Sequence, residues 1–178
     1  MRAFIAVELP DSIKEKALSI FGEERVGGIV PVKKEAMHIT LLFLGEISRR
    51  DAERLTSSLE NLKASRFNVE LLGLSSFPEG EPRVVFIKVT EGLQDLITLH
   101  KAVRKLAKQP ISITEENFSP HLTVARVKSR EGIFLAKKKI GENKDSKFGT
   151  FEVNSIAILE SELTSSGPMH KELARIEF

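Results

Sequence analysis

The sequence predicts an α+β protein built from two similar halves, each with the order β-α-β-α-β. Three observations support this fold class. Segments rich in β-branched and aromatic residues alternate with segments whose apolar residues recur at helical spacing. Landmarks of three different kinds recur in the second half, in the same order and at a nearly constant distance. At 178 residues, the chain has the size of a single domain.

The first half of the chain is expected to hold three strands and two helices. Asp11 directly follows Pro10 and is the expected N-cap of the first helix, and Ser48 is the expected N-cap of the second. The strands are expected at 2–9, 37–46 and 67–77, and the helices at 10–26 and 48–65.

The same order restarts after residue 82. The longest expected helix carries leucine and valine side chains along one side, and His100 lies among them, which favours a structural role for this histidine. Residues 171–178 are expected to add a last strand. The other strands are expected at 83–90, 119–127 and 151–163, and the helices at 91–109 and 130–141.

The spacing of the recurring landmarks indicates a duplication. They are Phe-Ile-x-Val at 4 and 86, His-x-Thr at 38 and 121, and Phe-x-Val at 67 and 151. The offsets are 86 − 4 = 82, 121 − 38 = 83 and 151 − 67 = 84. We therefore expect one bilobal domain over 1–178, with pseudo-symmetric lobes at about 1–81 and 82–178 whose antiparallel sheets line a central cleft.

The two His-x-Thr motifs each open an apolar strand. Because residues i and i+2 of a strand share a face, His38 and Thr40 are expected on one face and His121 and Thr123 on the equivalent face of the second half. Strict alternation places Phe43 on the opposite, core face. With the His and Thr content of this chain, chance yields two such motifs with a probability of roughly 1%. A pair of satisfied, half-buried structural histidines is the alternative interpretation.

Two histidines turned toward each other by a pseudo-twofold axis suit acid–base chemistry. An imidazole with a pKa near 6.5 can accept a proton when neutral and donate one when charged. A nucleophile can then lose a proton on one side of a phosphodiester while the leaving group gains one on the other. The two threonine hydroxyls are neutral donors suited to the non-bridging oxygens. The residues leave open which histidine is the acid.

Composition excludes several other chemistries. The chain has no cysteine, so disulfides, zinc–thiolate sites and cysteine nucleophiles are excluded. It has no His-x-His or HExxH motif and no G-x-S-x-G motif. It also lacks an apolar run near the roughly 20 residues that cross a bilayer. We expect no metal, no cofactor and no membrane association, and a cytoplasmic location.

With these two motifs, the sequence resembles the two-histidine (2H) phosphoesterases, and more narrowly the RNA 2′,3′-cyclic phosphodiesterases, long called 2′-5′ RNA ligases. The resemblance covers essentially the whole chain, in the segments MRAFIAVELP, HITLLFLGE, PRVVFIKV, SPHLTVARV and ILESELTSSGPMHKEL. It implies metal-independent opening of a 2′,3′-cyclic phosphate at an RNA end to a 2′-phosphomonoester. It also implies that a reverse 2′-5′ ligation of tRNA halves is accessible to some members.

The resemblance also implies residue roles. His38 would be the proton donor to the departing 3′ oxygen, His121 the proton acceptor that activates water, and Thr40 and Thr123 the phosphate-binding residues. Arg126 stands where the family carries a basic residue and is an expected RNA contact, with a surface salt bridge as the alternative. The implied partner is RNA with 2′,3′-cyclic phosphate ends, tRNA fragments among them, bound by a monomer.

The chain departs from the family in its aromatic residues. It has no tyrosine or tryptophan, and His170 lies about where the family often has tyrosine. Stacking on RNA bases would then fall to another ring, and Phe118 in the loop before the second motif is the candidate. Two other functions stay open: a phosphodiesterase acting on small cyclic nucleotides or 2′-5′ oligonucleotides, and a non-catalytic RNA-end or nucleotide-binding module.

Overall fold

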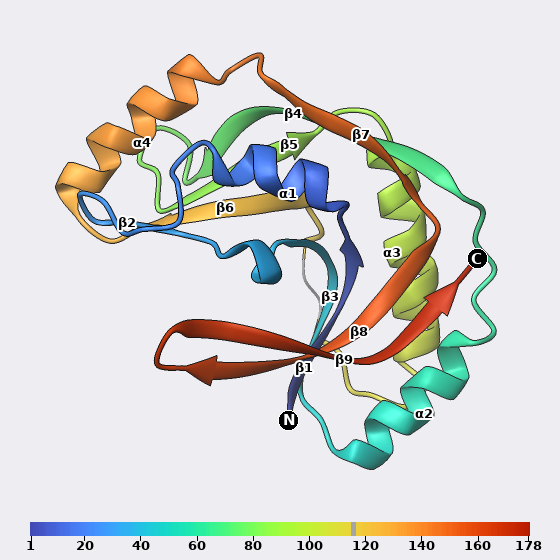
Figure 1. Cartoon of the computed structure of the whole chain (residues 1–178). Helices are drawn as coiled ribbons and strands as arrows, with labels where there is room; N and C mark the ends of the chain where they lie inside the picture. Colours follow the sequence, from blue (N-terminus) through green and yellow to red (C-terminus); the bar gives the residue numbers. More distant parts are fainter. Residues whose placement is uncertain (115–116) are drawn as a thin grey trace.

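The structure is a computed structural model that describes residues 1–114 and 117–178 (Figure 1). Strands and helices alternate along the chain, in agreement with the predicted α+β class. The strands are β1 Arg2–Glu8, β2 Ile29–Pro31, β3 His38–Glu46, β4 Phe67–Phe77, β5 Val84–Val89, β6 His121–Val127, β7 Lys147–Val153, β8 Ser155–Thr164 and β9 Gly167–Glu177. The α-helices are α1 Asp11–Leu18, α2 Arg49–Leu59, α3 Leu93–Ala107 and α4 Arg130–Glu142, and a 3₁₀ turn, η1, spans Lys34–Ala36.

Most of the expected elements are present, with changes of extent. α2 ends at Leu59 instead of residue 65, and β9 starts at Gly167 instead of residue 171. Asp11 is the first residue of α1 and not its N-cap, which is Pro10. The first helix ends at Leu18 instead of residue 26, and the short strand β2, which the sequence analysis missed, follows it. The expected strand 151–163 is two strands, because the chain passes from β7 to β8 at Asn154. The expected cap of α2 is confirmed: Ser48 Oγ accepts from the Asp51 amide at 3.1 Å, and an Asp51 carboxylate oxygen accepts from the Ser48 amide at 3.1 Å.

Two antiparallel sheets form the framework of the molecule. One has the strand order β3-β1-β8-β9 and the other the order β2-β6-β5-β4-β7. The long β8–β9 hairpin extends away from the rest of the chain, and α2 and α3 lie together near the C-terminus (Figure 1). β3, at the edge of its sheet, and β6 pack against each other. The strands that begin with the two motifs therefore meet where the two sheets approach.

The pairing of β4 with β7 reveals the symmetry of the duplication. The register of these strands pairs Phe67 with Val153, Asn68 with Glu152 and Val69 with Phe151. The offset across the central pair is 152 − 68 = 84, which is the offset of the Phe-x-Val landmark itself. Two residues that are equivalent in the repeat and also pair with each other lie on its pseudo-twofold axis.

Each half of the sequence contributes strands to the sheet of the other half. β4 continues into the five-stranded sheet, beside β5, and β7 continues into β8, which joins the four-stranded sheet beside β1. Each sheet therefore contains strands from both halves of the sequence. The expected boundary near residue 81 divides the sequence repeat but does not divide the two sheets.

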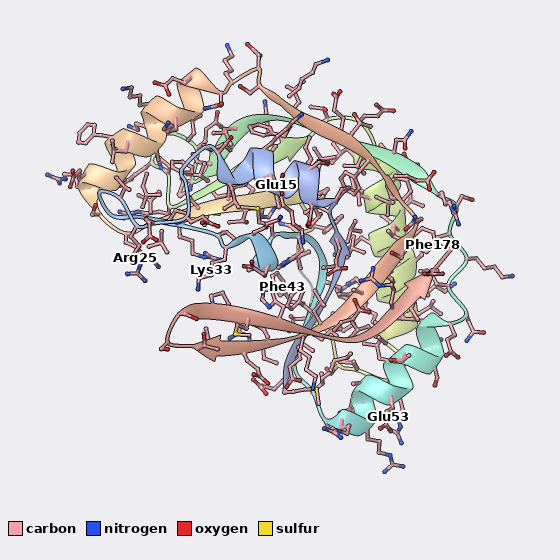
Figure 2. All side chains as sticks on the ribbon, in the orientation of Figure 1. Glu15, Arg25, Lys33, Phe43, Glu53 and Phe178 are labelled. Atoms are coloured by element: carbon pink, nitrogen blue, oxygen red, sulfur yellow. The ribbon has the colours of Figure 1, made fainter. Side chains whose placement is uncertain are left out.

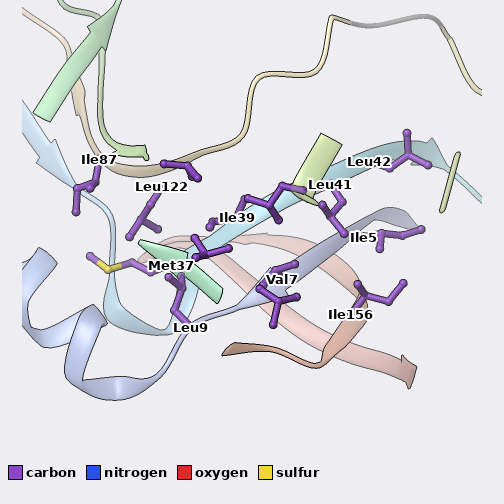
Figure 3. Close-up of a cluster of buried hydrophobic side chains, with 14 of the residues drawn as sticks. Ile5, Val7, Leu9, Met37, Ile39, Leu41, Leu42, Ile87, Leu122 and Ile156 are labelled. Atoms are coloured by element: carbon purple, nitrogen blue, oxygen red, sulfur yellow. The ribbon is translucent and has the colours of Figure 1, made fainter. Parts of the chain in front are cut away.

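One large apolar core joins the sheets and helices, and a smaller cluster of Phe4, Ala6, Ala157 and Leu159 is separate from it. Side chains from both motif strands and from their central neighbours β1 and β5 are buried in the large core, with Ile5, Ile39, Ile87 and Leu122 at 0% exposure (Figure 3). Ile39 and Leu122 each follow a motif histidine, so they anchor the motifs on the core. Within the described residues, no helix is long and apolar enough to cross a membrane.

Candidate functional site

His38 is the first residue of β3 and lies beside its own motif threonine. Its neighbours Met37 and Ile39 are buried, whereas His38 and Thr40 are only partly covered, as the alternation of a strand requires. The Nε2 atom of His38 lies 3.1 Å from Thr40 Oγ1, within hydrogen-bond distance. The first motif is thus a connected unit of imidazole and hydroxyl on the face opposite the core.

His121 opens β6 in the same way, and its ring has a defined tautomer. Its Nδ1 lies 2.7 Å from the carbonyl oxygen of Ser119, two residues earlier in the chain. A carbonyl only accepts, so Nδ1 carries the hydrogen and donates it. In the neutral ring, Nε2 is then an unprotonated acceptor. This arrangement suits a general base.

Each motif histidine is packed between two other rings. The ring of His38 lies 4.7 Å from that of Phe4 and 5.1 Å from that of His170. The ring of His121 lies 5.1 Å from that of Phe86 and 5.2 Å from that of Phe77. Phe4 and Phe86 are the equivalent residues of the Phe-Ile-x-Val landmark, so this recurrence could have identified them from sequence.

The two motif histidines differ in their second ring neighbour. His170 of β9 lies beside His38, whereas the apolar Phe77 of β4 lies beside His121. Only His170 can carry charge. The sequence marks His170 as a departure from the family. Its contact with His38 could not be predicted, because that contact depends on the pairing of β9 with β8.

A β-bulge in each motif strand redirects the residue that lies three positions after the threonine. In β3 the register passes from Ala6–Thr40 to Ile5–Leu42, which leaves Leu41 as an extra residue. Leu41 and Leu42 are both buried, and Phe43 is 56% exposed (Figure 2). The expectation that Phe43 faces the core is therefore wrong, because the bulge shifts the alternation by one residue and returns Phe43 to the face of Thr40.

The same irregularity occurs in β6. The register passes from Phe86–Thr123 to Val85–Ala125, so Val124 is the extra residue, and both Val124 and Ala125 are buried. Arg126 is exposed and follows His121 and Thr123 on the face away from the core. The strict two-residue alternation of a strand would instead place Arg126 on the face of Leu122. The bulge thus makes Arg126 available beside the second motif.

Phe118 occupies a different environment from the one expected. Its ring stacks on His100 at a centroid distance of 4.1 Å and an interplanar angle of 6°, and it packs partly buried against the core. One face of the ring is therefore already covered. A contact of Phe118 with RNA stays a prediction.

Burial and a neighbouring imidazole hold His38 neutral. Desolvation, followed by repulsion from His170, lowers the pKa of His38 to about 4, and a hydrogen bond with the Ala36 backbone opposes this in part. Burial also lowers the pKa of His170. Near pH 7, the ring of His38 is therefore neutral in the unliganded protein.

This shift makes folding stability depend on pH. The unfolded state, with a His38 pKa near 6.5, binds the proton before the folded state, with a pKa of about 4. Stability is therefore complete above about pH 6.5 and falls as the pH is lowered toward about 4. Because solvent partly screens the ring, we expect a loss of about 1–3 kcal/mol from this residue.

Urea denaturation of wild type and of His38→Gln at about pH 7 and about pH 4.5 measures this contribution. The stability of His38→Gln should fall less between the two values, with a difference from wild type of about 1–3 kcal/mol. Parallel losses in the two proteins would show that the folded state does not depress the pKa of His38.

The described residues offer few metal ligands near the motifs. No group of three or more His, Asp or Glu side chains that could hold a metal ion occurs within 1–114 and 117–178. The motifs themselves offer a substrate imidazole nitrogens and threonine hydroxyls, and the exposed Arg126 follows Thr123 in β6.

Sequence comparison places this arrangement in a known context. Residues 12–164 match the family model described as the 2'-5' RNA ligase superfamily. A protein of Archaeoglobus fulgidus named RNA 2',3'-cyclic phosphodiesterase is 36% identical over 181 residues, spanning 99% of this chain and 100% of that protein. A protein of the same name from Methanocaldococcus jannaschii is 32% identical over 173 residues, 96% of this chain and 97% of that protein.

Solved structures share the fold along the whole chain. The crystal structure of TT0787 from Thermus thermophilus has a TM-score of 0.77 and 29% identity, and the match covers 99% of this chain and 97% of that one. Escherichia coli LigT complexed with 3'-AMP has a TM-score of 0.80 at 21% identity, with 99% and 97% of the two chains covered. At that identity, the second likeness concerns the fold alone.

Proposed function

Because the chain belongs to the 2'-5' RNA ligase superfamily, we propose that this enzyme opens the 2′,3′-cyclic phosphate at the end of an RNA to a 2′-phosphomonoester. One observation carries the proposal: the two His-x-Thr motifs begin strands β3 and β6, which pack against each other. In the second motif, Nε2 of His121 can accept a proton, and in the first, Nε2 of His38 lies within hydrogen-bond distance of Thr40 Oγ1. In the proposed complex, both motifs contact a single phosphorus centre.

The reaction is an in-line displacement at phosphorus. Nε2 of His121 takes a proton from water as the water oxygen forms a bond to phosphorus. The bond from phosphorus to the 3′ oxygen breaks, and Nε2 of His38 gives its proton to that oxygen. The products are a 2′-phosphomonoester and a free 3′ hydroxyl, with the two histidines in exchanged protonation states. The Nδ1–H tautomer of His121 supports its role as the base.

The low pKa of His38 means that its ring must take up a proton from solvent when the substrate binds. In the unliganded protein its ring is neutral, so it cannot donate. A phosphodiester anion beside the ring favours the charged form and raises the pKa, by the mechanism through which any close opposite charge acts. Substrate binding and protonation of His38 are then coupled, and the His38 ring is charged only while an anion is bound.

Two side chains that the bulges turn to the motif faces, Arg126 and Phe43, would hold the RNA strand next to the reacting end. Arg126 can bind a backbone phosphate, and the exposed ring of Phe43 can stack a base. The bulges at Leu41 and Val124 put both side chains on the motif faces. These contacts favour an RNA end over a free cyclic mononucleotide.

Arg126→Ala should weaken RNA binding mainly through electrostatics. We expect the dissociation constant for a non-hydrolysed RNA with a 2′-phosphate end to rise, and the slope of log affinity against log salt to fall by about 0.7, the value for one phosphate contact on a single strand. Fluorescence anisotropy from about 50 to about 200 mM salt measures the slope. Phe43→Ala is the matched control, because removal of a neutral ring should reduce affinity and leave the slope unchanged. An unchanged slope in Arg126→Ala would remove it from the phosphate contacts.

The test of function uses a labelled oligoribonucleotide with a 2′,3′-cyclic end, incubated with the protein and excess chelator. We expect a product that carries a 2′-phosphate and still forms in chelator. A 3′-phosphate, or no turnover with tight end binding, would contradict the proposal; the second result would support a non-catalytic binding module. Equal rates on a free cyclic mononucleotide would favour the small-substrate alternative.

The origin of the RNA and the setting of the reaction are also part of this proposal. We place tRNA fragments among the substrates, a 2′-5′ joining of such fragments as the reverse reaction, and a monomer in the cytoplasm as the acting species. Adding a 5′-hydroxyl RNA to the 2′,3′-cyclic substrate and mapping any new linkage tests the reverse reaction. Light scattering on the purified protein tests the monomer.

A further inference from the structure

His100 is a polar residue buried in the core. It lies in the middle of α3 and is 9% exposed, with Leu96, Leu99 and Val103 of the same helix buried around it. A buried polar group costs free energy unless it is hydrogen-bonded, and an apolar residue would fill this position without that cost. The contacts of the imidazole show what it contributes.

The first contact is with the bulge in the first motif strand. Nδ1 of His100 lies 2.8 Å from the carbonyl oxygen of Leu41, so Nδ1 carries the hydrogen and donates it. Leu41 is the extra residue between Thr40 and Leu42 and has no partner in the register with β1. A bulge leaves such a residue outside the ladder, and its carbonyl needs another donor. His100 supplies that donor across the core.

The equivalent carbonyl in the second motif has a backbone donor. Val124 is the extra residue of β6, and its carbonyl accepts from the Val32 amide at 2.9 Å, next to the short strand β2. β2 extends the five-stranded sheet beyond β6, whereas β3 is itself the edge of its sheet. The side chain of His100 therefore takes the place that a neighbouring strand takes in the other half.

The second contact of His100 leads to the second motif. Its ring stacks on Phe118 at 4.1 Å. Phe118 directly precedes Ser119, whose carbonyl accepts from Nδ1 of His121 at 2.7 Å. One imidazole is thus linked to the bulge that follows Thr40 and to the loop that orients His121.

We propose that His100 is a positioning residue that aligns both His-x-Thr motifs at once. Its N–H fixes the bulge that keeps Thr40 and Phe43 on one face, and its ring fixes the loop whose carbonyl holds the tautomer of His121. The kinetic consequence rests on the proposed function, because misplacement of an acid or a base by about 1 Å can cost about 10²-fold in rate.

Two substitutions separate the two contacts. His100→Phe keeps a ring to stack on Phe118 and loses the donor to Leu41, and His100→Asn keeps an amide donor near the Nδ1 position and loses the ring. We expect His100→Phe to lower kcat by about 10- to 100-fold with KM changed less than about threefold. His100→Asn should recover at least about fivefold of that loss.

Val103→Ala is the matched control, since it truncates a fully buried apolar side chain of the same helix and leaves both contacts of His100 in place. We expect it to lower Tm with kcat unchanged below the transition. A kcat for His100→Phe equal to that of wild type would overturn the proposal. If His100→Phe does not fold, His100→Gln replaces it: its amide nitrogen corresponds to Nε2, so equal kcat values for His100→Asn and His100→Gln would also overturn the proposal.

A structural readout does not depend on turnover. The backbone amide resonance of Thr40 should move in His100→Phe, which loses the donor to Leu41, and that of Thr123 should move in His100→Asn, which loses the ring. Both should move in His100→Gln, which loses both contacts, and neither should move in Val103→Ala. An unmoved Thr123 resonance in His100→Asn would overturn the link to the second motif. If the variants show these movements but wild type turns over no cyclic-phosphate RNA, the proposed function fails while the positioning role stands.

Discussion

Replacement of either motif histidine by alanine should lower kcat on a cyclic-phosphate RNA end by about 10²- to 10⁴-fold, the usual contribution of a positioned acid or base. The effect should be largest in kcat because proton transfer occurs in the transition state, whereas the RNA is held mainly by other groups. The double variant should lose little more than the worse single variant, since an acid and a base that act together are not additive. Single-turnover kinetics with excess enzyme measures each loss.

His121→Asn is the control for positioning in this series. Its amide can still donate to the carbonyl of Ser119, as Nδ1 does at 2.7 Å, but nothing replaces Nε2. We expect it to be as inactive as His121→Ala, because the proton acceptor is lost in both. Near-normal turnover by any of these variants would remove that histidine from the mechanism.

The pH dependence of the single variants tests which histidine is the base. A base must be neutral, so its loss should remove the acid limb of the kcat/KM profile, and loss of the acid should remove the alkaline limb. We expect His121→Ala to lack the acid limb and His38→Ala to lack the alkaline limb. The opposite pattern would exchange the two roles without changing the reaction.

Thr40→Val and Thr123→Val should each lower kcat by about 10²-fold. Valine keeps the β-branched shape that a strand favours and removes only the hydroxyl, so the loss reports a missing donor to the phosphate oxygens. Thr→Ser at the same positions is the control, because it keeps the hydroxyl and should retain most of the rate. The measurement is kcat and KM for each of the four variants.

The two threonines should differ in one respect. Thr40 Oγ1 lies 3.1 Å from Nε2 of His38, so Thr40→Val also removes a hydrogen-bond partner of the proposed acid. We expect only this variant to shift the alkaline limb of the pH profile. Losses of less than about threefold in both valine variants would mean that neither hydroxyl binds the phosphate in the transition state.

The sequence alone predicted how the residues of the two motifs lie on their strands, because this arrangement depends on local geometry. The two-residue period of a strand puts His38 and Thr40 on one face, and the constant offset of the repeat puts His121 and Thr123 at the equivalent place. The cap of α2 was predictable for the same reason, since Ser48 and Asp51 are three residues apart and satisfy each other within one turn.

Prediction failed at the point where a partner strand intervenes. The expected core position of Phe43 was wrong because Phe43 lies beyond the bulge at Leu41, and a bulge is a property of a pair of strands that the alternation of a single strand does not reveal. The bulge at Val124 puts Arg126 on the face of the second motif in the same way, and its contact with RNA stays a prediction. Strand β2 was not predicted for a similar reason: its three residues are too few to show a period, and its structure depends on pairing with β6.

What the sequence determined by itself is the placement of two equivalent His-x-Thr motifs, each with its histidine and threonine on the partly covered face of its strand. The tertiary structure decided their surroundings: the exchange of β4 and β8 between the sheets, His170 beside His38, and the contacts of His100 with both motifs. The physical reason is range, because strand periodicity acts over a few residues, whereas strand partners and core contacts join residues that are far apart in the chain.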